Sequence, residues 1–210
     1  MAFSKGGVNP PPIPPEPPTS ASHLLNSMIV YMWDKVNKGD TMKEWRGLMK
    51  VLEIKHLSKN GELLHIEKDV KNILHYAGEE LILKILFAGL SVPEKYYIGL
   101  DSRTFLDPSV GIGSLFGFEP TDNAYERQQI QPDSFDVVTT NSGHRQANSP
   151  VILFKATGGA WGPVKNIFLT TNLGYGTNNV LISSAPLSRN ITVSDGETIT
   201  MKMGMALSNC

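Results

Sequence analysis

The chain has 210 residues, of which 40% are hydrophobic and 19% charged, and its formal net charge at pH 7 is -1. This length suits one substantial domain with an appendage or two small domains, and the hydrophobic fraction excludes a wholly disordered chain. A nearly neutral chain without a long basic run lacks the Lys/Arg excess that attracts nucleic acid, so no nucleic-acid partner is expected. The single cysteine, Cys210, excludes an internal disulfide and fits folding in a reducing cytoplasm.

The sequence shows no targeting or membrane-spanning segment, so no membrane is expected among its partners. The N-terminal residues run into prolines without the apolar segment of a secretory signal peptide. The longest apolar stretch, around residues 81–90, is interrupted by Lys84 and is too short to span a bilayer.

Residues 1–20 are predicted to be a proline-rich extended arm. Seven of the chain's 14 prolines fall within residues 9–18, and such a segment favours the polyproline II conformation. Two interpretations stay open: a disordered linker, or an arm that lies along a neighbouring subunit. A pre-extended segment loses less entropy on docking than a flexible one. The contact residues of such an arm would be Pro11, Pro12, Ile13 and Pro14.

Residues 21–90 are predicted to form a helix, a β-hairpin and a second helix. The first helix follows hydroxyl side chains at residues 19–22 and ends at Gly39, with apolar residues at helical spacing between them. An apolar stripe of this kind is either core or, because it follows an exposed arm, an interface between subunits. Its members are Leu25, Met28, Ile29, Met32, Trp33 and Val36.

The hairpin is predicted over residues 50–68, with Asn60-Gly61 as a two-residue type I′ turn. The second helix follows Gly78 and ends at Gly89 and Pro93. The expected hairpin register pairs Lys59 with Glu62, Leu57 with Leu64, His56 with His65 and Glu53 with Lys68.

The sequence offers few candidates for chemistry. Neighbouring imidazoles of His56 and His65 would bind zinc only if another ligand closed the site, and nothing places His75 there, so no metal is expected. The glycine-rich residues 111–117 match neither the dinucleotide-binding pattern nor the nucleophile elbow. Cys210 has no orienting base. We therefore predict no catalytic residue and no cofactor, and a protein that is not an enzyme.

Residues 91–210 are predicted to form an antiparallel β-sandwich, jelly-roll or immunoglobulin-like, so the whole chain is assigned to the α+β class. Apolar residues at 199, 201, 203 and 205 alternate with polar residues or glycine, which is typical of a half-buried strand. Further short β-rich runs at 151–154, 164–169 and 180–182 are separated by turn residues. The residues expected to be buried are Phe154, Phe168, Ile182, Ile199, Met201 and Met203.

Three segments, within residues 45–207, resemble a group of small tailed-bacteriophage virion proteins. The first is the hairpin followed by Asn72-Ile73-Leu74, a glycine and the apolar helix. The second is Tyr96-Tyr97-Ile98-Gly99-Leu100-Asp101 with the later Phe118-Glu119-Pro120 and Tyr125-Glu126-Arg127-Gln128. The third is Trp161-Gly162-Pro163 with the strand after it, residues 181–187 and the turn Asp195-Gly196-Glu197.

The resemblance implies an accessory structural protein of the virion without catalytic residues. Its expected role is to decorate or cement the capsid shell, with the major capsid protein as partner; the alternative is a neck, collar or tail-associated protein. It implies folding in the host cytoplasm before assembly and a homo-oligomer, with a trimer favoured. A hypothesis of another class is a carbohydrate-binding module. The side chains that would stack on sugars are Trp161 and the tyrosines at 96, 97, 125 and 175.

Overall fold

The computed structural model describes residues 47–207 except 142 and 144. The proline-rich arm at residues 1–20, the first predicted helix and Cys210 lie outside the described residues. So do the proposed interface residues Pro11, Pro12, Ile13, Pro14, Leu25, Met28, Ile29, Met32 and Trp33.

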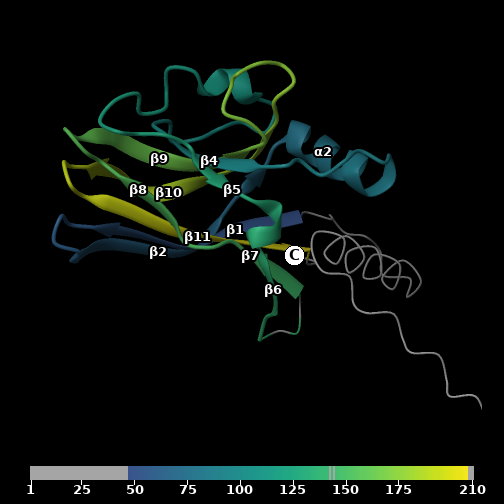
Figure 1. The fold of residues 1–210 in the computed structure, drawn as a ribbon, viewed down its shortest axis with the longest axis horizontal. Coiled ribbons are helices and arrows are strands. Elements are labelled where there is room, and N and C mark those ends of the chain that lie inside the picture. The colour runs from purple at the N-terminus through teal and green to yellow at the C-terminus, as the bar shows by residue number, and fades with distance from the viewer. Residues whose placement is uncertain (1–46, 142, 144, 208–210) are drawn as a thin grey trace, which may run out of the picture.

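The described residues form two antiparallel β-sheets that pack face to face (Figure 1). The first sheet has the order β2 (Leu63–Lys71), β1 (Gly47–Leu57), β11 (Thr198–Leu207), β7 (Arg145–Asn148) and β6 (Asp136–Thr139), and β8 (Ile152–Lys155) also pairs with β11. The second has the order β3 (Ile73–Leu74), β10 (Leu181–Val193), β9 (Trp161–Thr170), β4 (Tyr96–Asp101) and β5 (Gln128–Ile130). The prediction of an antiparallel β-structure is confirmed.

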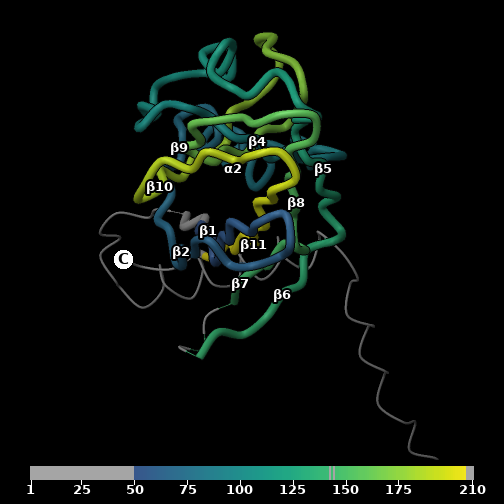
Figure 2. The backbone as a smooth tube through the Cα atoms, turned by 90° about the vertical axis from the view of Figure 1, so that its left-hand side faces the viewer, coloured from purple at the N-terminus to yellow at the C-terminus, as the bar shows by residue number. Residues whose placement is uncertain are grey.

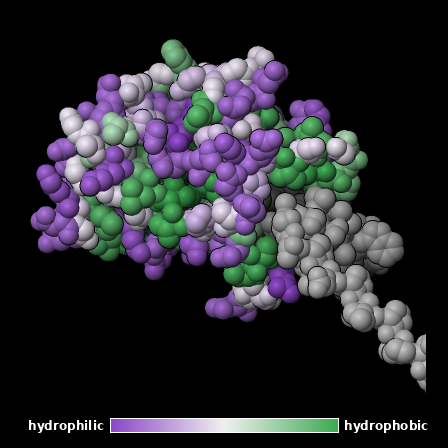
Figure 3. Space-filling model, viewed as in Figure 1, coloured by the Kyte–Doolittle hydropathy of each residue, from purple (hydrophilic) through white to green (hydrophobic). Residues whose placement is uncertain are grey.

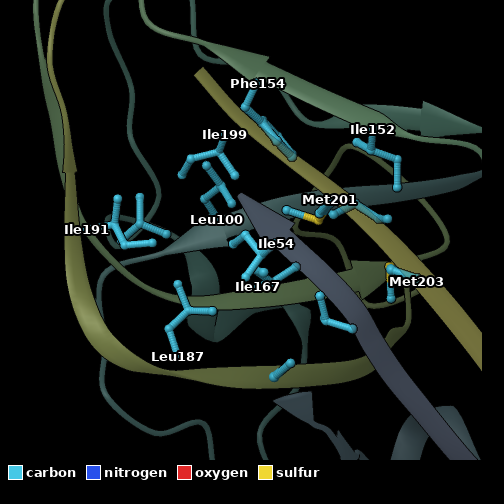
Figure 4. Packing of buried hydrophobic residues seen from close by; sticks show 14 of the residues in the cluster. Ile54, Leu100, Ile152, Phe154, Ile167, Leu187, Ile191, Ile199, Met201 and Met203 are labelled. Atoms are coloured by element: carbon cyan, nitrogen blue, oxygen red, sulfur yellow. The ribbon is translucent and has the colours of Figure 1, made fainter. Parts of the chain in front are cut away.

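The core lies between the inner faces of the two sheets (Figure 4). Ile54 and Met201 of the first sheet face Leu100 and Ile167 of the second. Burying an apolar side chain of this size contributes roughly 1.5–3 kcal/mol, so the alternating apolar positions fix which face of each strand points inward. Every residue that the sequence predicted to be buried is buried: Phe154, Phe168, Ile182, Ile199, Met201 and Met203.

The predicted hairpin is present, and its turn differs from the prediction. His56 pairs with His65 and Glu53 with Lys68 as expected, but a register shift places Leu57 opposite Leu63 rather than Leu64. The N–H of Gly61 donates to the carbonyl of Ser58 at 2.9 Å, and Gly61 has a φ of 83°.

The type I′ turn, with Lys59 paired to Glu62, is therefore wrong. It requires a positive φ at Asn60 as well, and Asn60 does not have one. The turn spans residues 58–61, and the Ser58 Oγ accepts hydrogen bonds from the N–H groups of Asn60 and Glu62 at 3.2 and 3.1 Å. A local side-chain bond thus favoured a longer turn.

The hairpin is also part of the sandwich. β1 pairs with β11 from Gly47↔Leu207 to Leu57↔Thr198, so it lies between β2 and the last strand of the chain. A boundary at residue 90 consequently does not separate the hairpin from the sandwich. The inner face of β1 required a partner sheet, and the long strands β9 and β10 of that sheet come from the C-terminal half of the chain.

The predicted second helix is α2 (Tyr76–Phe87). It ends where the N–H groups of Ala88 and Leu90 donate to the carbonyl of Lys84 at 3.0 and 3.1 Å, with Gly89 at a φ of 69°. No helix in the described part of the chain has the length and apolarity needed to cross a membrane.

Candidate functional site

Two long loops lie side by side over the outer face of the second sheet, at the top of Figures 1 and 2. One runs from β4 to β5 and includes the short helix η1 (Ile112–Leu115), and the other joins β9 to β10. A small core holds them on the sheet. It contains Leu106, Ile112, Leu115, Phe168 and Leu181.

The loops carry large apolar side chains that the small core does not bury. The most exposed is Phe116, with 72% of its surface accessible, and its ring meets that of Tyr175 edge-on at a centroid distance of 5.4 Å. We call this the loop surface. It consists of Phe105, Phe116, Phe118, Leu173 and Tyr175.

A buried ion pair fixes the geometry of these loops. Nε and Nη2 of Arg127 donate to the two carboxylate oxygens of Glu119 at 2.9 and 2.5 Å. Nη1 of Arg127 donates to the carbonyl of Asn172 at 2.9 Å, which ties the first loop to the second. The two-point geometry is the strong form of a charge-assisted hydrogen bond.

Two tyrosines complete the cluster around Glu119. The hydroxyls of Tyr125 and Tyr175 donate to its carboxylate at 3.0 and 2.8 Å, and the N–H of Leu100 donates to the Tyr125 hydroxyl at 2.8 Å. Burial, and after it the charge of Glu119, raises the pKa of Tyr125 well above its usual value. Burial and the bond to Glu119 also raise the pKa of Tyr175. Both hydroxyls therefore stay protonated at neutral pH and remain donors.

A second pair supports the start of the first loop. The carboxylate of Asp101 is fully buried and accepts from Nη2 of Arg103 at 2.7 Å. The guanidinium of Arg103 in turn lies 4.2 Å from the centroid of the Phe118 ring. The two ion pairs thus position loop-surface residues, and their charged groups are occupied by partners within the chain.

The histidines of the hairpin bind separate carboxylates. Nε2 of His56 lies 2.9 Å from Glu197, and Nε2 of His65 lies 2.9 Å from Glu67. Glu67 also accepts from the N–H of Ser188 at 2.9 Å, which links β2 to β10. Burial would raise the pKa of Glu67, but the bonds from His65 and Ser188 outweigh it and lower that pKa.

His75 is placed apart from the hairpin pair. It is fully buried at the start of α2, where its Nε2 and the Ser184 Oγ are hydrogen bonded at 2.9 Å. Within the described residues, no three His, Cys, Asp or Glu side chains are grouped so that they could hold a metal ion.

The residues of the carbohydrate hypothesis are mostly in the core. Trp161 is only 6% exposed, its Nε1 donates to the carbonyl of Asn123 at 3.1 Å, and its ring packs on Tyr125. Tyr96 packs against the same core, and Tyr97 is half-buried. Trp161 and Tyr125 therefore offer no free face to a sugar, and Tyr175 at the loop surface is the most accessible ring of that set.

Sequence reasoning named Glu119 and Arg127 only as parts of the resemblance and gave them no role, and it gave Tyr125 only the role of a ring that would stack on sugars. Nothing in their spacing predicts that they meet, because the contact depends on how the loop folds over β4. Comparison of the chain with protein-family models, with curated proteins and with solved structures gave no significant match.

Proposed function

We propose that the protein is a non-enzymatic structural component of a tailed-bacteriophage virion, one that decorates or cements the capsid shell. The observation that carries this proposal is the loop surface. Buried ion pairs hold its apolar side chains in solvent-exposed positions, and this arrangement is suited to contact with another protein rather than to catalysis. A closely packed lattice of partners adds avidity to each weak contact.

The resemblance supports the virion assignment at one point. Glu119, Tyr125 and Arg127 belong to its second segment, and they are the residues that hold the loop surface in place. The proposal includes the finer expectations: an N-terminal helix, a jelly-roll or immunoglobulin-like connection pattern, a trimer, and cytoplasmic folding before assembly. The rival within the same class is a neck, collar or tail-associated protein.

The copy number of the protein in purified particles distinguishes a shell protein from a neck or tail protein. A shell protein approaches the major capsid protein in stoichiometry, whereas a neck or tail protein is present in far fewer copies. Quantitative densitometry of particle gels measures this ratio. Absence of the protein from particles contradicts both virion proposals.

A rebinding experiment tests the loop surface itself. Purified full-length protein is added to particles that lack it, and Phe116→Ser is compared with Val151→Ser, a similarly exposed apolar residue outside the loops. We expect Phe116→Ser to weaken binding on the order of thirtyfold, the loss typical of a central contact residue, and Val151→Ser to bind normally. Equal binding of both variants contradicts the loop surface as the contact.

The carbohydrate-binding alternative keeps one supporting observation, the exposed ring pair of Phe116 and Tyr175. Aromatic faces of this kind also stack on sugars. Glycan-array binding by the wild type that is lost in Tyr175→Ala would favour this alternative.

A further inference from the structure

Much of the apolar side-chain surface of helix α2 is exposed to solvent. Its sequence from Leu81 to Phe87 is apolar except for Lys84, yet Gly78 is the only residue of the helix that is buried. Figure 3 shows hydrophobic residues gathered over α2, at the right of the molecule. We define the α2 surface by its exposed members, Tyr76, Leu83, Phe87 and the following Leu90.

One narrow side of α2 is in contact with the sandwich. Gly78 lies against the backbone of Ile182 on β10, and Leu81 packs on the main core. A helix of 12 residues is marginal in water when it stands alone, and most helical stability comes from packing of an apolar face. A contiguous apolar surface of this kind on a short helix therefore points to a further packing partner.

The part of the sequence before β1 contains a second apolar segment that could pack on this surface. The stripe at residues 25–36 has apolar residues at helical spacing, and it belongs to the 46 residues that precede the described structure. Two apolar helical faces of similar length are suited to pack on each other, since each buries the surface that the other exposes.

The geometry of the chain allows this contact. The chain enters the sandwich at Gly47, and Lys50 is paired with Lys71, five residues before the start of α2. Tyr76 is therefore at most roughly 34 Å from Gly47, and the ten residues 37–46 span about 33–36 Å when extended. Figure 1 shows the start of β1 and α2 at the same end of the sandwich.

We propose that the apolar stripe of residues 25–36 packs on the α2 surface of the same chain. Tethering by a short linker gives the stripe an effective concentration in the millimolar range, so it occupies the surface ahead of a second copy at ordinary concentrations. This inference is independent of the proposed virion function. It assigns the stripe to the protein's own core and leaves the proline-rich arm for contact with partners.

A cross-linking experiment on the full chain tests the contact. In a Cys210→Ser background, Met32→Cys is combined with Leu83→Cys and treated with a short bis-maleimide. The matched control combines Met32→Cys with Leu153→Cys on β8, since Leu83 and Leu153 are 50% and 53% exposed. We expect the α2 pair to cross-link within one chain at least about tenfold faster than the control, because of proximity. Equal rates, or cross-linked dimers as the main product, would overturn the proposal.

Fluorescence of Trp33 gives a second measurement. The emission of Trp33 is obtained as the difference between each protein and its Trp33→Phe variant. We expect acrylamide quenching of this emission to rise severalfold when Leu83→Asp and Phe87→Asp are introduced together, and to stay unchanged with Leu153→Asp. Both α2 residues are exposed in the described structure, so the charges do not disturb the sandwich core. A Trp33 that is quenched equally in all three proteins contradicts the contact.

Discussion

Glu119 and Arg127 form a two-point ion pair in which only 4% of each side chain remains exposed. Replacing Arg127 by Met would leave the carboxylate of Glu119 buried with two tyrosine hydroxyls and no cation. We expect the free energy of unfolding to fall by about 3–5 kcal/mol, the usual loss when one partner of a buried pair is removed. Denaturant unfolding measures the change.

The double variant Glu119→Leu, Arg127→Met is the matched control for that prediction. It removes both charges, so we expect it to be more stable than Arg127→Met alone even though Tyr125 and Tyr175 lose their acceptor. The single variants Glu119→Leu and Arg127→Met complete the comparison. If their losses of unfolding free energy add up to the loss in the double variant, the two residues are not coupled. Glu80→Gln, which removes an exposed pair with Lys84, should have no resolvable effect.

A second prediction concerns Gly78, where α2 approaches β10. A Cβ at this position would lie 2.7 Å from the Cα of Ile182 and would also overlap the Ile182 carbonyl oxygen. Backbone cannot move aside as a flexible side chain does, so we expect Gly78→Ala to destabilise the protein by about 1–3 kcal/mol. Thermal unfolding measures the loss.

The sign of the Gly78→Ala effect is diagnostic. In a helix without a close neighbour, alanine is more favourable than glycine by up to about 1 kcal/mol. Gly111→Ala serves as control, because a Cβ there meets nothing within 4 Å and its φ is -91°. We expect that control to be neutral or slightly stabilising. Stabilisation by Gly78→Ala would mean that α2 does not lie against β10.

The sequence predicted the sandwich core and not the site, and the physical reason differs between the two. Alternation along a strand is local, so the burial of Met201 and Met203 follows from the sequence alone. The Ser58 Oγ that reshaped the hairpin turn is also local and could have been weighed against the Asn-Gly preference. The contact of Arg127 with Asn172 joins two loops whose paths no periodicity determines. Pairing of β1 with β11 likewise depends on topology across the whole chain.

A third prediction concerns protonation of His75. Burial lowers the pKa of its imidazole below the usual 6.5, against the opposing effect of the nearby Val110 and Pro108 carbonyls. The folded state therefore prefers the neutral ring. Its contribution to stability is complete above pH 6.5 and is lost as the pH falls from 6.5 through the lower folded pKa.

NMR titration tests His75 directly. The imidazole resonance that disappears in His75→Gln identifies the residue, and we expect its midpoint to lie below 6.5. The difference in unfolding free energy between wild type and His75→Gln should shrink over the same pH range. A His75 midpoint at or above 6.5 would contradict a buried neutral ring.

The last prediction concerns the proline-rich arm, which lies outside the described residues. We expect a chain that begins at Ser20 to melt within about 2 °C of the full-length protein, because residues 1–19 contain few apolar side chains that could be buried and their loss should cost well under 1 kcal/mol. Assembly onto particles should weaken, since the arm supplies a pre-extended contact. Differential scanning calorimetry and the rebinding experiment measure the two effects separately. The full-length variant Pro11→Ala, Pro12→Ala, Pro14→Ala keeps the length of the arm and loses its pre-extension. Its binding to particles should therefore fall between that of the wild type and that of the truncated chain. A large drop in melting temperature for the truncated chain would place the arm within the folded core.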